Sequence, residues 1–158
     1  MHRRLIVGCA RRSVDAVTQI AQLPGETIII SRRRDVTERC ADLDVQCLRR
    51  DPSDPSEYPD DVDTVICAGG DTDTNHMLML TVRERYPSAP LIVIGGTADG
   101  SRAATAIETT ADRWVRRGPV MAAALGGVLG VSHASRGWQL MQLLRATEGP
   151  LAVLMHAT

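Results

Sequence analysis

Residues 5–13 read LIVGCARRS, in which an apolar run ends at Gly8 and a helix-compatible segment follows. Consecutive apolar β-formers predict a buried strand, and the glycine predicts a tight turn at its end. In dinucleotide-binding folds the loop G-x-G-x-x-G occupies this place and holds phosphate groups. Here its three glycine positions carry Gly8, Ala10 and Ser13. The stretch therefore predicts an α/β fold, and it leaves open whether so altered a loop still binds a nucleotide.

The alternation of strands and helices continues along the chain. Strand-like runs are expected at 4–8, 27–31, 45–48, 63–69, 91–96 and 113–115. The second and fifth runs are continuously apolar, which is typical of parallel strands covered on both faces. Helix-compatible segments with short connections predict right-handed crossovers between them. We therefore expect an α/β, doubly wound parallel sheet of Rossmann type over residues 1–118.

Composition is that of an ordinary globular protein. The 158 residues are 44% hydrophobic and 23% charged, and the net charge of −1 gives no electrostatic reason to expect binding to nucleic acid or membrane. The longest apolar stretch, 119–131, is shorter than the roughly 20 residues that a membrane span needs. The cysteines lack C-x-x-C and zinc-site spacing, so we expect buried free thiols in a reducing cytoplasm. They are Cys9, Cys40, Cys47 and Cys67.

The first loop has two interpretations. Gly8, Cys9 and Ala10 would bring backbone N–H groups to a pyrophosphate at the start of the first helix, where the helix dipole favours anions. Arg11 and Arg12 follow and would meet a phosphate directly. The alternative is a plain strand–helix connection with solvated arginines.

The end of the second expected strand lacks an acid. Dinucleotide sites place a carboxylate there for the ribose hydroxyls, whereas this chain has Ser31 followed by Arg32, Arg33 and Arg34. Arginine at this place fits a 2′-phosphate or another extra phosphate; the alternative is a basic helix start that faces solvent. Asp35 is expected within the helix and does not replace the missing acid.

Two further loops reach the same edge of the sheet. Asp51 and Ser53 follow the third run, and Gly69, Gly70 and Asp71 follow the fourth. These glycines let backbone approach a ligand, or they form a turn before a helix capped by an aspartate. The candidate cofactor-binding residues are Gly8, Cys9, Ala10, Arg11, Arg12, Ser31, Arg32, Asp51, Ser53, Gly69, Gly70 and Asp71. No histidine has a partner at metal-ligand spacing and no G-x-S-x-G elbow occurs, so no catalytic set is expected in residues 1–147.

The segments RDPSD (50–54) and AGGDTDTN (68–75), set in this alternation, resemble the TrkA-N domain. That domain is the nucleotide-binding regulatory module of potassium-channel and transporter gating rings. The resemblance spans residues 3–118 and implies NAD(P) or an adenine nucleotide as ligand. The chain departs from the family pattern at the glycine loop and at Ser31.

The tail suggests a longer parent protein. Residues 119–148 are expected to form linker or dimerisation helices, in which Gly126 and Gly130 permit close packing. The segment GPLAVLMHAT (149–158) resembles the opening of DHH-family phosphoesterase domains, and His156 matches the histidine that precedes their D-x-D pair. The resemblance implies the N-terminal part of an archaeal, exopolyphosphatase-related phosphoesterase, whose Mn²⁺ would belong to the catalytic domain.

We therefore expect a cytoplasmic, homodimeric regulatory domain that binds a nucleotide and is itself non-catalytic. Three alternatives stay open. They are a TrkA-type regulatory subunit of potassium transport, a ligand-free dimerisation or docking domain, and, ranked last, a stand-alone oxidoreductase.

Overall fold

Six parallel strands form one sheet in the order β3-β2-β1-β4-β5-β6 in the computed structural model, which describes residues 2–116. The strands are β1 (Arg3–Val7), β2 (Glu26–Ile30), β3 (Gln46–Leu48), β4 (Thr64–Gly70), β5 (Leu91–Gly95) and β6 (Arg113–Val115). The helices are η1 (Arg11–Ser13), α1 (Val14–Ala21), α2 (Arg34–Cys40), η2 (Pro55–Glu57), α3 (Thr72–Arg85) and α4 (Arg102–Thr110). The strand order reverses between β1 and β4, as in doubly wound sheets. The expected fold class is confirmed.

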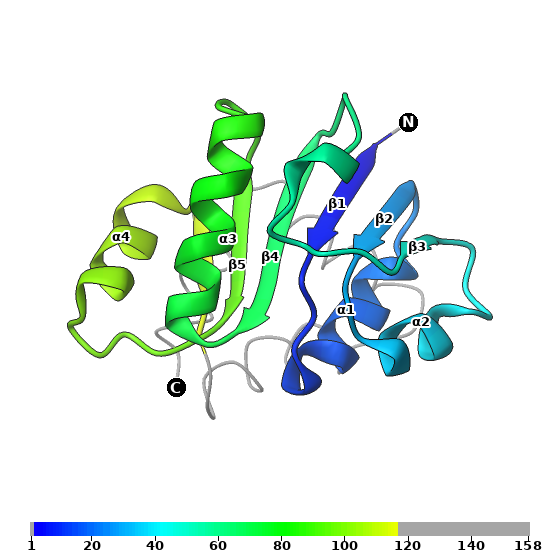
Figure 1. Ribbon diagram of the computed structural model, residues 1–158, viewed down its shortest axis with the longest axis horizontal. Coiled ribbons are helices and arrows are strands. Elements are labelled where there is room, and N and C mark those ends of the chain that lie inside the picture. The colour runs from blue at the N-terminus through cyan, green and yellow to red at the C-terminus, as the bar shows by residue number, and fades with distance from the viewer. Residues whose placement is uncertain (1, 117–158) are drawn as a thin grey trace.

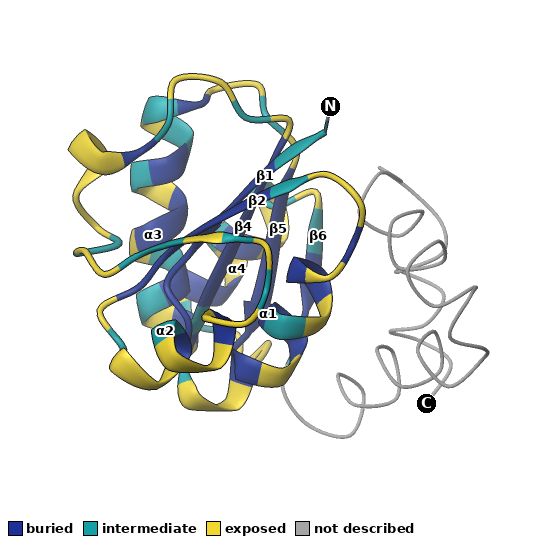
Figure 2. Cartoon of the chain, turned by 90° about the vertical axis from the view of Figure 1, so that its right-hand side faces the viewer, coloured by how far each residue is buried: buried dark blue, intermediate teal, exposed yellow. Residues whose placement is uncertain are grey.

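Helices cover both faces of the sheet, and the strand arrows of Figure 1 point the same way. Alternate side chains of β1 enter two separate cores: Ile6 packs with residues of α1 and α2, and Leu5 packs with residues of α3 and α4. The edge-on view of Figure 2 shows the buried residues along the strands and on the inner sides of α1 and α3. Burial on both faces explains why β2 and β5 are continuously apolar.

The expected boundaries agree with the structure to within one residue at each strand end. The run at 113–115 coincides with β6, and the run at 4–8 differs from β1 by one residue at each end. The helical stripes are also confirmed, since Val14 and Val17 are buried on α1, and Met79 and Val82 are buried on α3. Helix α3 ends at Arg85, two residues before the proline at position 87.

Some expectations concern residues outside the described range. The helical segment 119–148 with Gly126 and Gly130, and the segment 149–158 with His156, both lie beyond residue 116. Among the helices between residues 2 and 116, none has the length and apolar character to cross a membrane.

The four cysteines are free thiols with different accessibility. Cys9, Cys40 and Cys67 are buried, whereas Cys47 is half-buried and lies 3.8 Å from the hydroxyl oxygen of Thr37. Burial raises the pKa of Cys9 to about 12 and also raises the pKa of Cys67. Because the thiolate is the reactive form, these two thiols are chemically quiet in the folded state.

We expect Cys47 to be alkylated first when the native protein meets iodoacetamide at pH 8, because it is the only one of the four residues that is not buried. Timed labelling followed by peptide mass spectrometry gives the order, and the Cys47→Ser variant should lose the fast-labelled peptide. Labelling of Cys67 ahead of Cys47 would contradict the packing of β4.

Candidate functional site

The turn after β1 requires glycine at its first position. Gly8 has a φ of +72°, and its N–H donates to the carbonyl of Ile30 over 2.8 Å. A Cβ atom at this position would lie 2.9 Å from Cδ1 of Leu78 on α3. Both the left-handed conformation and the close contact exclude a larger residue. The first glycine of the loop therefore keeps its structural role.

Ala10, at the second glycine position, directs its methyl group towards Gly70. A Cβ atom built on Gly70 would lie only 2.2 Å from the Cβ of Ala10. The N–H of Ala10 donates to the carbonyl of Ala68 on β4 over 2.9 Å, which fixes this approach. Position 10 can be alanine because position 70 is glycine. The glycine that this close contact requires therefore lies at position 70, at the end of β4, and not at position 10 in the first loop.

The helical segment that follows starts without a side-chain cap. Neither Ala10 before η1 nor Ser13 before α1 accepts a hydrogen bond through its side chain, and Ser13 is buried. Arg11 and Arg12 are exposed, and within residues 2–116 their side chains make no ion pair and no hydrogen bond. The first N–H groups of a helix have no intrahelical acceptor and carry partial positive charge. The N–H of Ser13 donates to the carbonyl of Ala10, so this start combines the N–H groups of Arg11 and Arg12, which lack a side-chain cap, with two cations unpaired within the same described range.

The arginines after β2 are neutralised instead. Each of the three forms an ion pair with a carboxylate, and two of the partners lie on α2 itself. The pairs are Arg32–Asp51, Arg33–Asp35 and Arg34–Glu38, with N···O distances of 2.5, 2.7 and 3.0 Å. Asp35 lies in the first turn of α2, as expected.

Ser31, the residue where an acid was expected, is buried with 1% of its surface exposed. Its Oγ accepts a hydrogen bond from the N–H of Arg33 over 3.1 Å, and its own N–H donates to the carbonyl of Leu48. Ser31 therefore shapes the turn into α2, and its side chain does not line the surface of the candidate site.

Asp51 is held in a hydrogen-bonded turn beside Arg32. Its Oδ1 accepts hydrogen bonds from the N–H of Ser53 over 2.9 Å and from the Ser53 hydroxyl over 2.7 Å. These bonds, and Arg32 after them, hold the pKa of Asp51 below its usual value. The hydroxyl of the buried Tyr58 donates to the carbonyl of Pro52 and anchors the same turn. Two loops that are distant in sequence therefore meet at this corner.

Asn75 joins the ends of β4 and β5. Its Oδ1 accepts a hydrogen bond from the N–H of Gly69 over 2.7 Å, and its Nδ2 donates to the carbonyl of Ile94 over 3.0 Å. The side chain is fully buried. These hydrogen bonds were not identified from the sequence, whose only signal for them is an amide residue shortly after a pair of glycines. The hydrogen bond to Asn75 leaves the Gly69 N–H unavailable to a ligand.

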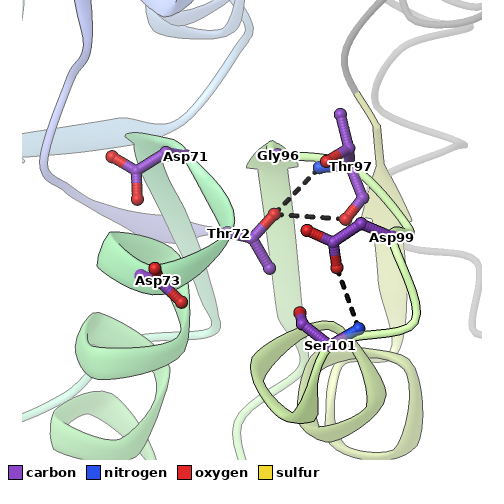
Figure 3. A pocket seen from close by; sticks show the side chains of 7 residues that line it. All are labelled: Asp71, Thr72, Asp73, Gly96, Thr97, Asp99 and Ser101. Carbon is purple, nitrogen blue, oxygen red and sulfur yellow. Dashed lines mark hydrogen bonds between the residues drawn. The ribbon is translucent and has the colours of Figure 1, made fainter.

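Asp71 caps α3, as one of the two interpretations expected. Its Oδ1 accepts a hydrogen bond from the N–H of Thr74 over 2.8 Å. Next to it lies a pocket of about 270 Å³ between the starts of α3 and α4 (Figure 3). Thr72 holds its two sides together, since its Oγ1 accepts from the N–H of Thr97 and donates to the Thr97 carbonyl. The lining residues are Asp71, Thr72, Asp73, Gly96, Thr97, Asp99 and Ser101.

The pocket extends beyond the residues expected from sequence. The segment 96–101 follows β5, and its sequence signal is limited to two adjacent glycines that precede a helix cap. Three carboxylates make the pocket acidic. In the described range, however, no group of three or more His, Cys, Asp or Glu side chains is arranged to hold a metal ion.

The structure therefore brings the expected residues together in two places: Ala10 adjoins Gly70 at the sheet centre, and Arg32 adjoins Asp51 at its β2–β3 side. No family model matches this chain, and no curated protein matches it.

We expect Gly70→Ala to lower the free energy of unfolding by about 3 kcal/mol, because it adds a clash with Ala10 to the strain of a left-handed backbone. Gly100→Ala is the matched control: its φ is +76°, nothing lies within 4 Å of the added Cβ, and the loss should be about 1 kcal/mol. Urea unfolding measures both. Equal losses would refute the contact, and Ala10→Gly should restore part of the stability of the Gly70→Ala protein.

Asn75→Ala should destabilise the protein by about 3 kcal/mol, because it leaves the buried N–H of Gly69 and the carbonyl of Ile94 without partners. Thr81→Ala, at a half-buried position on the same helix where the hydroxyl bonds only to the carbonyl of Met77, should change stability by less than about 1 kcal/mol. Thermal or urea unfolding distinguishes the two variants. Similar losses of stability in both would contradict the role of Asn75 in joining the ends of β4 and β5.

Proposed function

We propose that this chain is a regulatory nucleotide-binding domain whose ligand lies across the carboxyl edge of the sheet, with its phosphates at the start of η1. The observation that carries the proposal is the uncapped helix start with the exposed Arg11 and Arg12, which are unpaired among residues 2–116. Helices α3 and α4 differ, because Asp71 and Ser101 cap them with side-chain oxygens.

The position of this helix start supports the proposal. It follows β1 at the point where the strand order reverses, and ligands of doubly wound sheets bind in the crevice at such a point. Helix N-termini attract phosphate through their free N–H groups and their dipole. Arginine adds a planar donor group that matches phosphate oxygens. Position, free donors and positive charge therefore coincide.

The ligand class that fits is NAD(P) or an adenine nucleotide. Arg11 and Arg12 would hold the phosphates, because the N–H groups of Gly8 and Ala10 already donate to the carbonyls of Ile30 and Ala68. Arg32 with Asp51 lies on the side of the sheet where the sugar of the adenosine half is expected. We propose a regulatory role and not a catalytic one, because the polar side chains on this edge serve structural contacts. Asn75 links two strands, and Asp71 caps a helix.

The parent protein is proposed from the tail. The resemblance of residues 149–158 to the start of a DHH-family phosphoesterase domain supports control of such an enzyme by the nucleotide site. Coupling of this kind requires a ligand that prefers one of two arrangements of the whole protein.

Titration calorimetry with NAD, NADP, ATP, ADP and AMP tests the proposal. The double variant Arg11→Ala, Arg12→Ala should bind the best of these ligands at least about tenfold more weakly, because it removes charge-assisted bonds to phosphate. Arg102→Ala removes an exposed arginine at the start of α4 and is the matched control, with an expected change below about twofold. Failure of all five nucleotides to bind at millimolar concentration would overturn the proposal.

A further inference from the structure

The positive charge of the site is unevenly distributed. At the end of β2, Arg32 is engaged by Asp51, and the two arginines that follow are engaged by carboxylates on α2. At the start of η1, Arg11 and Arg12 have no such partners within the described residues. An anionic ligand group therefore finds unpaired cations at the centre of the sheet, and only neutralised ones at the β2–β3 side.

The carboxylate of Asp51 is pre-oriented with spare hydrogen-bonding capacity. Its Oδ1 takes two donors from Ser53, and its Oδ2 takes one from Arg32. A carboxylate offers about four acceptor directions, so one stays open on Oδ2. The side chain is 37% exposed, so an incoming hydroxyl can reach it. The lowered pKa of Asp51 keeps it ionised at neutral pH, in a form that accepts and does not donate.

We propose that Asp51 supplies, from the end of β3, the carboxylate that the end of β2 lacks, and that the site consequently selects nucleotides with a free 2′-hydroxyl over those with a 2′-phosphate. The inference rests on the proposed function and specifies the ligand class of that same site. It argues against one of the two interpretations of the arginine run, in which these arginines meet a 2′-phosphate.

The physical reason is competition for Arg32. In dinucleotide sites a carboxylate at this corner accepts hydrogen bonds from ribose hydroxyls, whereas a nearby arginine accommodates a 2′-phosphate. A 2′-phosphate would have to draw Arg32 away from Asp51 and would then lie beside an ionised carboxylate. Like charges this close repel each other, whereas a hydroxyl uses the open acceptor and leaves the ion pair intact.

Further contacts hold the turn that carries Asp51 in place. Tyr58 is buried, stacks on Tyr86 with ring centroids 6.1 Å apart, and donates its hydroxyl hydrogen to the carbonyl of Pro52. Asp54 caps η2 by accepting from the N–H of Ser56. Moving the Asp51 carboxylate away from an approaching phosphate would therefore cost free energy, because it would disrupt this turn.

Calorimetry on the whole chain with two matched ligand pairs tests the inference. NADP should bind at least about tenfold more weakly than NAD, and 2′-deoxy-ADP about tenfold more weakly than ADP, because each lacks the hydroxyl that Asp51 would bind. These comparisons use the unaltered protein, so they do not depend on the folding of any variant.

The variant Asp51→Asn should reduce both ratios to less than about threefold, because it removes the charge that repels phosphate and weakens the bond to the hydroxyl. Asp60→Asn is the matched control: it removes a carboxylate paired with Arg85 at 2.9 Å, in the loop before β4, and should leave both ratios unchanged.

The outcomes separate the two claims. Binding of NADP as tightly as NAD, or of 2′-deoxy-ADP as tightly as ADP, overturns the role of Asp51 while the nucleotide site stands. Equal ratios in the Asp51→Asn variant and the unaltered protein also overturn it. If none of the four ligands binds, and ATP and AMP fail as well, the nucleotide site itself is refuted, and the inference with it.

Discussion

The close approach of the β1 turn to the end of β4 is the contact on which the candidate site depends. The hydrogen bond from Ala10 to the carbonyl of Ala68 and the packing of the Ala10 methyl group over Gly70 hold these two segments together. Gly70 has a φ of +91°, and the pairing of β4 with β5 shifts register just before it. A side chain at Gly70 would separate the two segments at the point where the sheet reverses, and η1 would lose its contact with β4.

Charge is arranged along the carboxyl edge in three zones. The β2–β3 side carries arginines paired with carboxylates, such as Arg32 with Asp51. The sheet centre carries Arg11 and Arg12, which have no ion-pair partner in the described part of the chain, at a helix start without a side-chain cap. The β4–β5 side carries the acidic pocket around Asp99, where a phosphate would be repelled. For the nucleotide proposed above, this order would favour one direction of binding, with the phosphates at the centre.

Much of the fold was predictable because its signals are local. Gly8 ends β1 with a left-handed turn, and Asp71 caps α3 through a residue three positions later. The prediction was weaker wherever a side chain had a distant partner. Arg32 is engaged by Asp51, 19 residues away, and Asn75 reaches carbonyls on β5, so neither role was visible in the surrounding sequence.

The loop after β1 shows most clearly this difference between local signals and contacts with residues distant in sequence. Apolar runs, turn residues and helical stripes act over a few residues, so the chain alone was enough to indicate a parallel α/β sheet with a strand–glycine–helix turn at Gly8. Whether Ala10 is compatible with that turn, and which arginines are paired with carboxylates, depends on residues that are distant in sequence. Only the folded chain places them next to one another. Packing against Gly70 and ion pairing with Asp51 are contacts through space, and no spacing along the chain encodes them.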